Sequence, residues 1–333
     1  MNISIKKWYH IIVPFAIKTK ISQIKNRKEL RLSKAYFEYR EEYFKQHMDD
    51  YKFDDTRKKD ILRIFTKIKK SGCVTFPDMN ASIREKYFTR NLKIEQDPGT
   101  KLFYVLVDDG KKLFYKRGMD ETSIKQAFNS VSFEQDFESP HRYLTNDRHF
   151  IGVIESNKKH YDDNSFGINK NDVVIDAGAA EGNFALSVID TASKIYLIES
   201  DPEWCEALTQ TFLPYKEKVE IIQKNLSDTN NDNNITISEL LTKYTINKID
   251  FLKMDIEGYE KQTLYGALIN KEKIANITKM AICVYHKPED ELEISNFLSN
   301  QGYKFYLTKG YMILLDPNPA LLPIRKTVLR AYN

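Results

Sequence analysis

Residues 172–183 read DVVIDAGAAEGN, and this stretch decides the fold. Val173–Ala177 is a short apolar run of the kind that forms a buried strand, and a helix-forming segment begins at Asn183. Gly178 and Gly182 lie between them and predict a tight turn. Gly178 would permit a tight turn and close backbone approach, and Gly182 would let the following helix pack against the strand. A strand, a glycine turn and a helix in this order are typical of the first unit of a doubly wound α/β sheet.

The same alternation continues along the second half of the chain. We expect strands over residues 173–177, 195–198, 219–223, 251–254 and 280–285, and helices over 183–189, 203–212, 238–244, 259–268 and 289–298. This spacing suits β–α–β crossovers, which predict a mostly parallel, doubly wound sheet. Residues 303–307 and 311–315 predict a closing β hairpin, and therefore an antiparallel edge.

The first 130 residues have a different pattern. Aromatic and aliphatic side chains recur at helical spacing in residues 26–70. Two β-rich runs near residues 102–116 flank an Asp-Gly step that suits a hairpin turn, and a helix is expected over residues 121–130. We therefore predict a mainly helical region over residues 1–130, containing one β hairpin, and an α/β domain over residues 131–333.

The net charge of +4 conceals an asymmetry along the chain. Residues 1–70 carry 19 Lys and Arg against 9 Asp and Glu, whereas residues 151–333 carry 20 against 26. A basic segment can bind nucleic acid or an anionic membrane surface. Because acidic residues are interleaved with the basic ones, a solvated helical face is the favoured interpretation, and we expect no nucleic acid partner.

The N-terminal stretch predicts an amphipathic helix. Trp8, Ile11, Ile12 and Phe15 form one apolar stripe, and lysines flank it. Docking on the protein's own core is the favoured interpretation. The alternative is peripheral contact of residues 1–24 with the inner face of an anionic membrane.

Two further features indicate the compartment. The apolar run of the N-terminal stretch is too short to cross a bilayer, and it lacks a small-residue cleavage site. Cys73, Cys205 and Cys283 are too few and too scattered for a disulfide framework or a CxxC zinc site. We therefore expect a cytoplasmic protein.

Acidic residues at the predicted strand ends indicate the ligand. Asp176 and Glu181 would place negative charge beside the pyrophosphate of NAD or ATP, whereas they would stabilise the ammonium and sulfonium groups of S-adenosylmethionine. Glu199 ends the second strand and can accept both hydroxyls of an adenosine ribose, which fits NAD as well. Leu226 could cover an adenine face. The predicted cofactor-binding residues are Asp176, Gly178, Ala179, Glu181, Gly182, Asn183, Glu199, Ser200, Asn225 and Leu226.

The end of the fourth strand carries the candidate reacting centre. Asp255 and Glu257 follow the strand and precede a glycine turn, so they could orient a substrate hydroxyl, take its proton or hold a cation. A capped, acidic helix entry is the alternative interpretation, and Glu260 could serve only to complement the helix dipole. His286 follows the fifth strand and titrates near neutrality, which makes it a candidate general base. We predict Asp255, Glu257 and His286 as catalytic residues and expect no metal ligand.

The sequence resembles a known family in several motifs. VVIDAGAAEGNF (173–184), the acid Glu199, NLSD (225–228) and above all DFLKMDIEGYE (250–260) look like the FkbM-type S-adenosylmethionine-dependent methyltransferases. The resemblance covers residues 130–315. It implies a class I (Rossmann-like) methyltransferase fold and O-methylation of a hydroxyl on a sugar, polysaccharide, lipid or natural-product precursor.

The resemblance also implies roles for matching residues. Asp176, Gly178, Gly182 and Glu199 would bind the cofactor, and Asp255 and Glu257 would border the reacting centre. The chain departs from the family pattern at two places. Ile237-Ser238 stands where the family often has Leu-Asp, and Ala180 stands where it commonly has asparagine.

Three alternative functions remain open. A nucleic-acid methyltransferase is disfavoured because the DPNP motif (316–319) follows the last strand instead of the fourth. An NAD-linked oxidoreductase is disfavoured by Asp176 and Glu181. A non-catalytic, membrane-associated scaffold would retain the fold without turnover.

Overall fold

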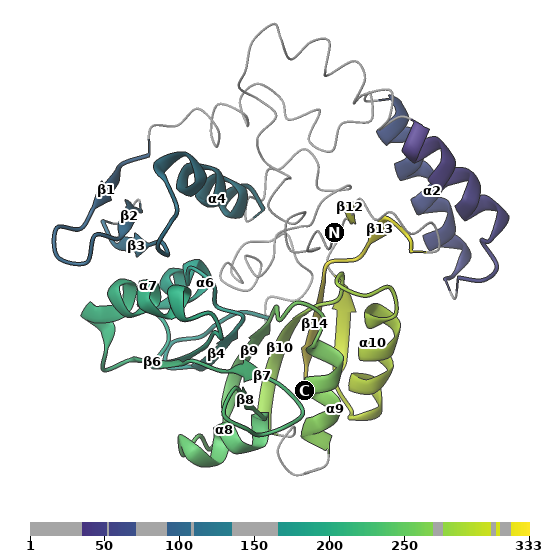
Figure 1. Ribbon diagram of the computed structural model, residues 1–333. Coiled ribbons are helices and arrows are strands. Elements are labelled where there is room, and N and C mark those ends of the chain that lie inside the picture. The colour runs from purple at the N-terminus through teal and green to yellow at the C-terminus, as the bar shows by residue number, and fades with distance from the viewer. Residues whose placement is uncertain are drawn as a thin grey trace, which may run out of the picture.

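The computed structural model describes residues 35–51, 53–70, 92–107, 110–134, 166–268, 276–307, 311–313 and 321–333. A seven-stranded sheet forms its centre, in the order β11-β14-β10-β9-β4-β5-β6 (Figure 1). The strands are β4 (Val173–Ala177), β5 (Lys194–Ile198), β6 (Val219–Ile222), β9 (Ile249–Met254), β10 (Ile277–Cys283), β11 (Lys304–Leu307) and β14 (Val328–Tyr332). The predicted α/β class with a mainly parallel sheet is confirmed.

The order of the strands places the functional site. The chain enters the sheet at β4, runs outward through β5 and β6, and then returns to the other side of β4 as β9. Strand β4 therefore pairs in parallel with both β5 and β9. In sheets of this kind ligands bind outside the carboxyl ends of the strands, where the winding direction reverses. Here that point is the pair of loops that follow β4 and β9.

The antiparallel pair at the edge of the sheet has a different second member from the predicted one. Strand β11 pairs with β14, which also pairs antiparallel with β10. Residues 311–315 were expected to supply the partner of β11. Instead β12 (Met312–Ile313) pairs with β13 (Ile324–Arg325) in a separate two-stranded sheet. The predicted hairpin of 303–307 with 311–315 is therefore wrong. Strand β14 is the antiparallel partner of β11, and residues 312–313 pair with β13.

Helices cover both faces of the sheet, close to the predicted positions. They are α6 (Asn183–Val188), α7 (Pro202–Phe212), α8 (Ile237–Lys243), α9 (Glu260–Leu268) and α10 (Asp290–Asn300). Alternate residues of one strand enter different cores, as period-2 geometry requires: Val174 packs in the cluster that holds α6 and α7, and Ile175 in the one that holds α8, α9 and α10. Short elements complete this half, namely η3 (Leu213–Tyr215), β7 (Asn225–Leu226) and β8 (Asn234–Ile235).

The predicted hairpin near residues 102–116 is present and has a third strand. β2 (Phe103–Leu106) pairs with β3 (Lys112–Phe114), and β1 (Ile94–Gln96) adds to its other edge. Ile124 and Phe128 of the following helix, α4 (Glu121–Glu134), belong to the same buried cluster as α6 and α7. The backbone N–H of Phe114 donates to Thr211 Oγ1 of α7 at 2.9 Å. Residues 92–134 therefore pack on the sheet domain, and the boundary at residue 130 stays a prediction.

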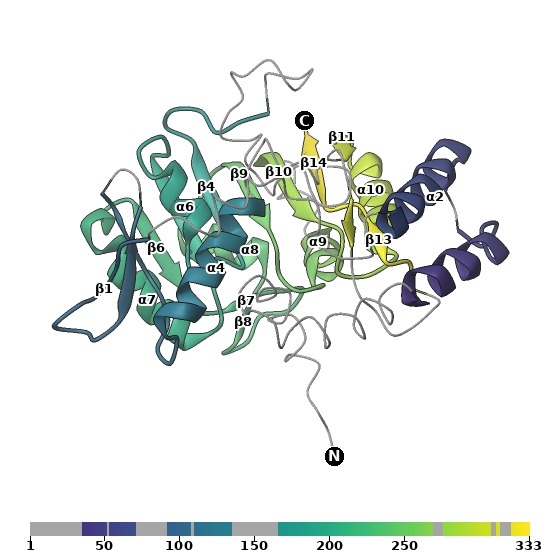
Figure 2. The ribbon, with the colours of Figure 1, turned by 90° about the horizontal axis from the view of Figure 1, so that it is seen from above.

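An N-terminal helix pair lies at the opposite end of the molecule from β1–β3 (Figure 2). It consists of a helix over residues 35–46 and α2 (Asp55–Lys70). Its apolar faces form one cluster with residues beside and within β12 and β13; the buried members are Phe37, Phe44, Ile61, Ile64, Phe65, Ile68, Tyr311, Leu322 and Ile324. Aromatic and aliphatic side chains at helical spacing therefore make a core here, as the sequence pattern predicts.

The location of the protein was predicted from three features, which the structure addresses in part. The amphipathic stretch 1–24 and Cys73 lie outside the described residues. Cys205 and Cys283 are buried free thiols. Among the described helices, none combines the length and the apolar character needed to cross a membrane.

Candidate active site

The glycine turn after β4 touches the end of β9. Gly178 has a φ of +74°, and a Cβ built there would lie 1.8 Å from the carbonyl oxygen of Asp255. The backbone N–H of Asp255 donates to the carbonyl of Ala177 at 3.0 Å. The close backbone approach predicted at Gly178 is thus between the two strand ends that border the site.

Gly182 allows a contact that the sequence did not indicate. Its φ is +81°, and a Cβ there would lie 2.7 Å from Leu208 Cδ2 and 2.8 Å from Phe212 Cε2. Both side chains belong to α7. The missing side chain therefore lets the start of α6 pack against α7, whereas we expected the close packing to be against the strand.

A buried ion pair lies beneath the turn. Lys253 Nζ lies 2.9 Å from Asp176 Oδ1, and both side chains are almost completely buried. The same ammonium donates to the carbonyl of Gly178 at 2.6 Å. Burial acts against the charge on Lys253, but the neighbouring carboxylates of Asp176 and Asp255 raise its pKa, so it stays charged. Asp176 therefore supports the turn from below, and its predicted contact with a cofactor remains a prediction.

Glu199 is held firmly at the end of β5. Its Oε2 accepts the N–H of Ala180, and its Oε1 accepts the N–H of Asp201, each at 2.9 Å. The carboxylate thus joins the glycine turn to the loop after β5. Glu181 lies on the same turn and is half-buried; burial, with the charges of Asp176 and Glu199, raises its pKa to about 6. The clustering of acids at this edge matches the expectation of a cationic ligand.

The other predicted cofactor-binding residues differ from one another in how exposed they are. Ala179 is buried in a core cluster, Asn183 begins α6, and Ser200 is exposed beside Glu199. Asn225 is exposed, and its side-chain amide donates to Asn233 and Asn234 of the neighbouring strand region. Leu226 is 2% exposed within a core cluster. An adenine contact by Leu226 would require its side chain to leave that cluster, and it stays a prediction.

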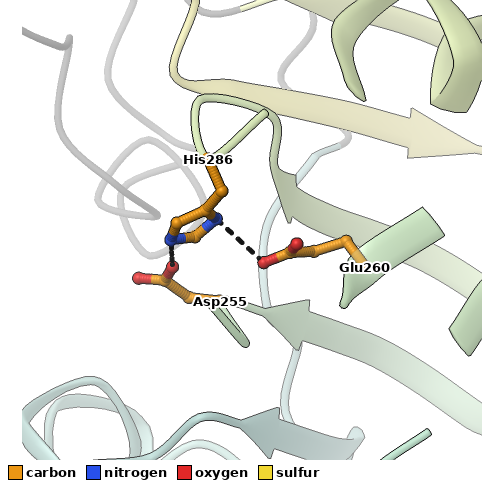
Figure 3. A group of neighbouring side chains, drawn as sticks. All are labelled: Asp255, Glu260 and His286. Atoms are coloured by element: carbon orange, nitrogen blue, oxygen red, sulfur yellow. Dashed lines mark ion pairs between the residues drawn. The ribbon is translucent and has the colours of Figure 1, made fainter. Parts of the chain in front are cut away.

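His286 lies close to three carboxylates at the ends of β9 and β10, two of which, Asp255 and Glu260, are drawn with it in Figure 3. Its Nε2 lies 3.4 Å from Asp255 Oδ1 and 3.8 Å from Glu257 Oε2. Its Nδ1 lies 3.1 Å from Glu260 Oε1. The imidazole is buried and Glu260 is completely so, whereas the side chain of Glu257 is 79% exposed. The three predicted catalytic residues therefore do come together.

The carboxylates control the charge of this histidine. Burial lowers its pKa, but Glu260, Asp255 and Glu257 outweigh burial and raise it to about 9. The imidazole is therefore protonated at neutral pH, and it becomes a base only after losing that proton. Tyr285 adds a hydroxyl, which donates to Asp255 Oδ1 at 3.2 Å.

Asp255, Glu260 and His286 are also close enough to be considered as metal ligands. Figure 3 shows that Asp255 and Glu260 face different nitrogens of the same ring. An ion that took Nε2 with Asp255 would therefore leave Glu260 bound to Nδ1. The expectation that the site has no metal ligand stays a prediction.

Two functional residues were missed or undervalued in the sequence. Lys253 is a charged residue inside an apolar strand, and that misplacement was the signal that it pairs with a buried acid. Glu260 was interpreted as a residue that complements a helix dipole. It does accept the N–H of Ile256 at 2.8 Å near the helix start, but it also reaches His286. No sequence signal identifies this second contact.

A parallel sheet that reverses at β4, one antiparallel strand beside its edge and an acidic glycine turn together define a class I methyltransferase fold. The family model "Methyltransferase FkbM domain" matches residues 77–305, which is more than half of the chain, and the chain belongs to this family. It is an S-adenosylmethionine-dependent methyltransferase. The match begins at residue 77, well before residue 130, where the resemblance in sequence begins. Membership in a methyltransferase family argues against the alternative of an NAD-linked oxidoreductase.

Several solved structures are similar over about half of this chain. An rRNA methylase from Streptococcus thermophilus is 15% identical over 50% of this chain and 89% of its own, with a TM-score of 0.33. A putative methyltransferase from Streptococcus mutans, in complex with SAH, is 18% identical over 50% and 90%, with a TM-score of 0.32. The precorrin-6y C5,15-methyltransferase from Geobacter metallireducens is 9% identical over 56% and 90%, with a TM-score of 0.36. Among the curated proteins none matches this chain.

Proposed function

We propose that this enzyme transfers a methyl group from S-adenosylmethionine to a hydroxyl oxygen of a sugar, a polysaccharide or a lipid-linked glycan precursor. The observation that carries the proposal is His286, held between Asp255, whose backbone contacts the glycine turn, and Glu260. A hydroxyl acceptor loses a proton during methylation, and this group offers a place for that proton.

The residues around the glycine turn fit the cofactor. Asp176, Glu181 and Glu199 gather acidic groups at the turn, where burial and the charges of Asp176 and Glu199 raise the pKa of Glu181. A ligand with an ammonium and a sulfonium relieves this repulsion, whereas a pyrophosphate increases it. When bound, S-adenosylmethionine supplies an electrophilic methyl group. Asp176, Gly178, Glu181 and Glu199 would hold it.

The chain's own side chains provide positioning and proton transfer. Glu260 faces Nδ1, which leaves Nε2 directed to the side of Asp255. In the deprotonated state of His286, Nε2 accepts the proton of an acceptor hydroxyl. Asp255, oriented by Tyr285, accepts a second hydrogen bond from the acceptor or stabilises the imidazolium that results. Alignment of the acceptor oxygen supplies much of the remaining rate enhancement.

The rim of the site supports a polyhydroxylated acceptor. Glu257 is exposed, and Tyr259 is 57% exposed on the same loop. Lys287 Nζ lies 5.7 Å from the centre of the Tyr259 ring. Carboxylates accept hydrogen bonds from sugar hydroxyls, and an exposed aromatic ring packs against the apolar face of a sugar.

A labelling experiment tests this function. Radiolabelled S-adenosylmethionine would be incubated with the enzyme and a panel of glycans, lipid-linked sugars and RNA. We expect label in a hydroxyl-bearing acceptor, a loss of at least about a hundredfold in rate for His286→Gln, and no change for the matched control His47→Gln, which lies in the turn after the first N-terminal helix and outside the buried cluster of the helix pair. Label in RNA, full activity of His286→Gln or the absence of any transfer would overturn the proposal; the last would favour the non-catalytic scaffold.

We also propose a cytoplasmic location, with peripheral contact of residues 1–24 at the inner face of the membrane as the alternative to docking on the protein's own core. The apolar stripe of Trp8, Ile11, Ile12 and Phe15 and its flanking lysines support this. Flotation with vesicles containing anionic lipid should recover the full chain but not a variant with Lys6, Lys7, Lys18 and Lys20 changed to Gln. Equal recovery of both would contradict the contact.

A further inference from the structure

Arg325 binds the main chain at the catalytic histidine. It lies on β13 and is 6% exposed. Its Nη1 donates to the carbonyl of Tyr285 at 2.8 Å and to the carbonyl of His286 at 3.0 Å. Its Nε donates to the carbonyl of Leu322 at 3.0 Å. One buried guanidinium therefore joins the segment before β14 to the residue that carries the imidazole.

These contacts begin just after the last backbone hydrogen bond that pairs the end of β10 with the segment before β14. The pairing of β10 with β14 ends at Cys283 and Val328, and the N–H of Val284 then donates to the carbonyl of Thr327. Tyr285 and His286 lie beyond that last backbone bond. Arg325 satisfies their carbonyls with a charged donor, which forms stronger hydrogen bonds than a neutral one. The position of the His286 main chain thus depends on this side chain.

The segment that carries Arg325 is supported by the N-terminal helix pair. Leu322, whose carbonyl accepts from Arg325, and Ile324, which precedes Arg325, are buried in one cluster with Phe37, Phe44 and Phe65. Ile324 is completely buried there. The figures agree in placing α2 beside β13 (Figures 1 and 2).

The same helix pair supports the other side of the histidine loop. Arg57 of α2 forms two hydrogen bonds with Glu291 of α10, at 2.9 and 2.6 Å. The neighbouring residue, Asp290, accepts the N–H of Lys287 at 3.0 Å. His286 therefore lies between two supports, and each is connected to residues 35–70.

We infer that Arg325 is a positioning residue for His286 and that the N-terminal helix pair is part of the catalytic unit. The inference rests on the proposed function, because it concerns the geometry of the proposed base. A displacement of about 1 Å at a catalytic group can reduce a rate by about a hundredfold without affecting binding. Loss of Arg325 should therefore lower kcat and leave the KM for S-adenosylmethionine nearly unchanged.

The test compares Arg325→Met, Arg325→Lys and Arg57→Gln with a matched control, Arg117→Met. Arg117 forms a similar two-bond pair with Glu206, but on α7 near β3. We expect kcat to fall at least about tenfold in Arg325→Met, to recover in part in Arg325→Lys and to fall less in Arg57→Gln. The control should keep its kcat, and S-adenosylhomocysteine should bind all four variants within about twofold, as calorimetry would measure.

A second readout keeps the inference testable if Arg325→Met does not fold. In Arg325→Lys the ring resonance of His286 should shift or broaden in NMR spectra, while that of His47 stays in place. A wild-type kcat in a folded Arg325→Met, or an unchanged His286 resonance in Arg325→Lys, would overturn the inference. Failure of the proposed function has a different signature, namely no hydroxyl methylation by the wild type or full activity of His286→Gln.

Discussion

Two groups of charged residues lie at neighbouring strand ends, and they differ in what stabilises their carboxylates. The turn group consists of Asp176, Lys253 and Glu199. There Lys253 pairs with Asp176, and backbone N–H groups hold both oxygens of Glu199. The histidine group consists of Asp255, Glu257, Glu260 and His286, in which three carboxylates surround one imidazole.

The difference between the two groups corresponds to a division of tasks. In the turn group fixed partners set the charge and leave little freedom, which suits a framework for a cofactor. In the histidine group the charge depends on a proton that leaves near pH 9. A group that can gain and lose a proton suits the reacting centre.

The largest expected effect comes from removing the cation of the turn group. Lys253→Met would leave the completely buried Asp176 without its partner. We expect the free energy of unfolding to fall by about 4 kcal/mol, because an unpaired buried charge is costly. Urea denaturation would measure it. The double variant Lys253→Met, Asp176→Asn should be more stable than Lys253→Met alone, and an equal or lower stability would show that the pair is not coupled.

The next effect tests the contact between the two groups. In Gly178→Ala the new Cβ would collide with the carbonyl oxygen of Asp255 and force the ends of β4 and β9 apart. We expect a loss of about 3 kcal/mol in the free energy of unfolding. Gly118→Ala is the matched control, because Gly118 has a similar φ of +78° with no atom within 4 Å of its Cβ position. A similar loss of unfolding free energy in both variants would show that the positive φ, and not the collision with Asp255, causes the destabilisation.

A smaller effect should separate the two groups by ligand. Glu199→Gln keeps one acceptor oxygen but cannot accept from both Ala180 and Asp201. We expect S-adenosylhomocysteine to bind about tenfold more weakly, since one hydrogen bond to a charged group is lost. Calorimetry would measure the affinity. The matched change in the histidine group, Glu257→Gln, should leave this affinity unchanged. An equal loss of affinity in both variants would argue against assigning cofactor binding to the turn group alone.

The smallest expected effect is a shift along the pH axis. Because only the deprotonated imidazole acts as a base, kcat should rise with pH as His286 loses its proton near pH 9. Glu260→Gln removes the carboxylate nearest Nδ1, lowers the pKa of His286 and moves the midpoint to lower pH by about one unit. Glu257 is exposed, so Glu257→Gln should shift it less. A shift to higher pH, or none, would exclude His286 as the titrating base.

The sequence contained most of the fold between β4 and β10. Strands and helices there are local patterns, so apolar runs and glycine turns located them within a few residues. Strand β14 could not be found in this way. It includes the buried Arg330, a charged residue that interrupts the apolar pattern, and its pairing with β10 and β11 joins residues far apart in the chain. Residues 311–315 were the more apolar candidate for the same place.

The sequence predicted which residues lie at the site better than it predicted the contacts between them. The rule that ligands bind at the carboxyl ends of parallel strands selected Asp255 and His286. It could not indicate that Lys253 neutralises Asp176, because that pairing depends on which face of each strand points inward at the turn. It also could not indicate that Arg325 reaches His286, since a separate two-stranded sheet brings them together.

The place of β14 has a consequence for how the protein is made. During translation β11 leaves the ribosome before β14, yet β14 lies between β11 and β10 in the finished sheet. Without β14, the edge of β10 would lack its antiparallel partner and β11 would lack the strand with which it pairs. Arg325 lies three residues ahead of β14, and its guanidinium donates to the carbonyl of His286. The pairing of β14 thus closes the sheet and joins Arg325 to the main chain of His286, although every predicted site residue lies earlier in the chain.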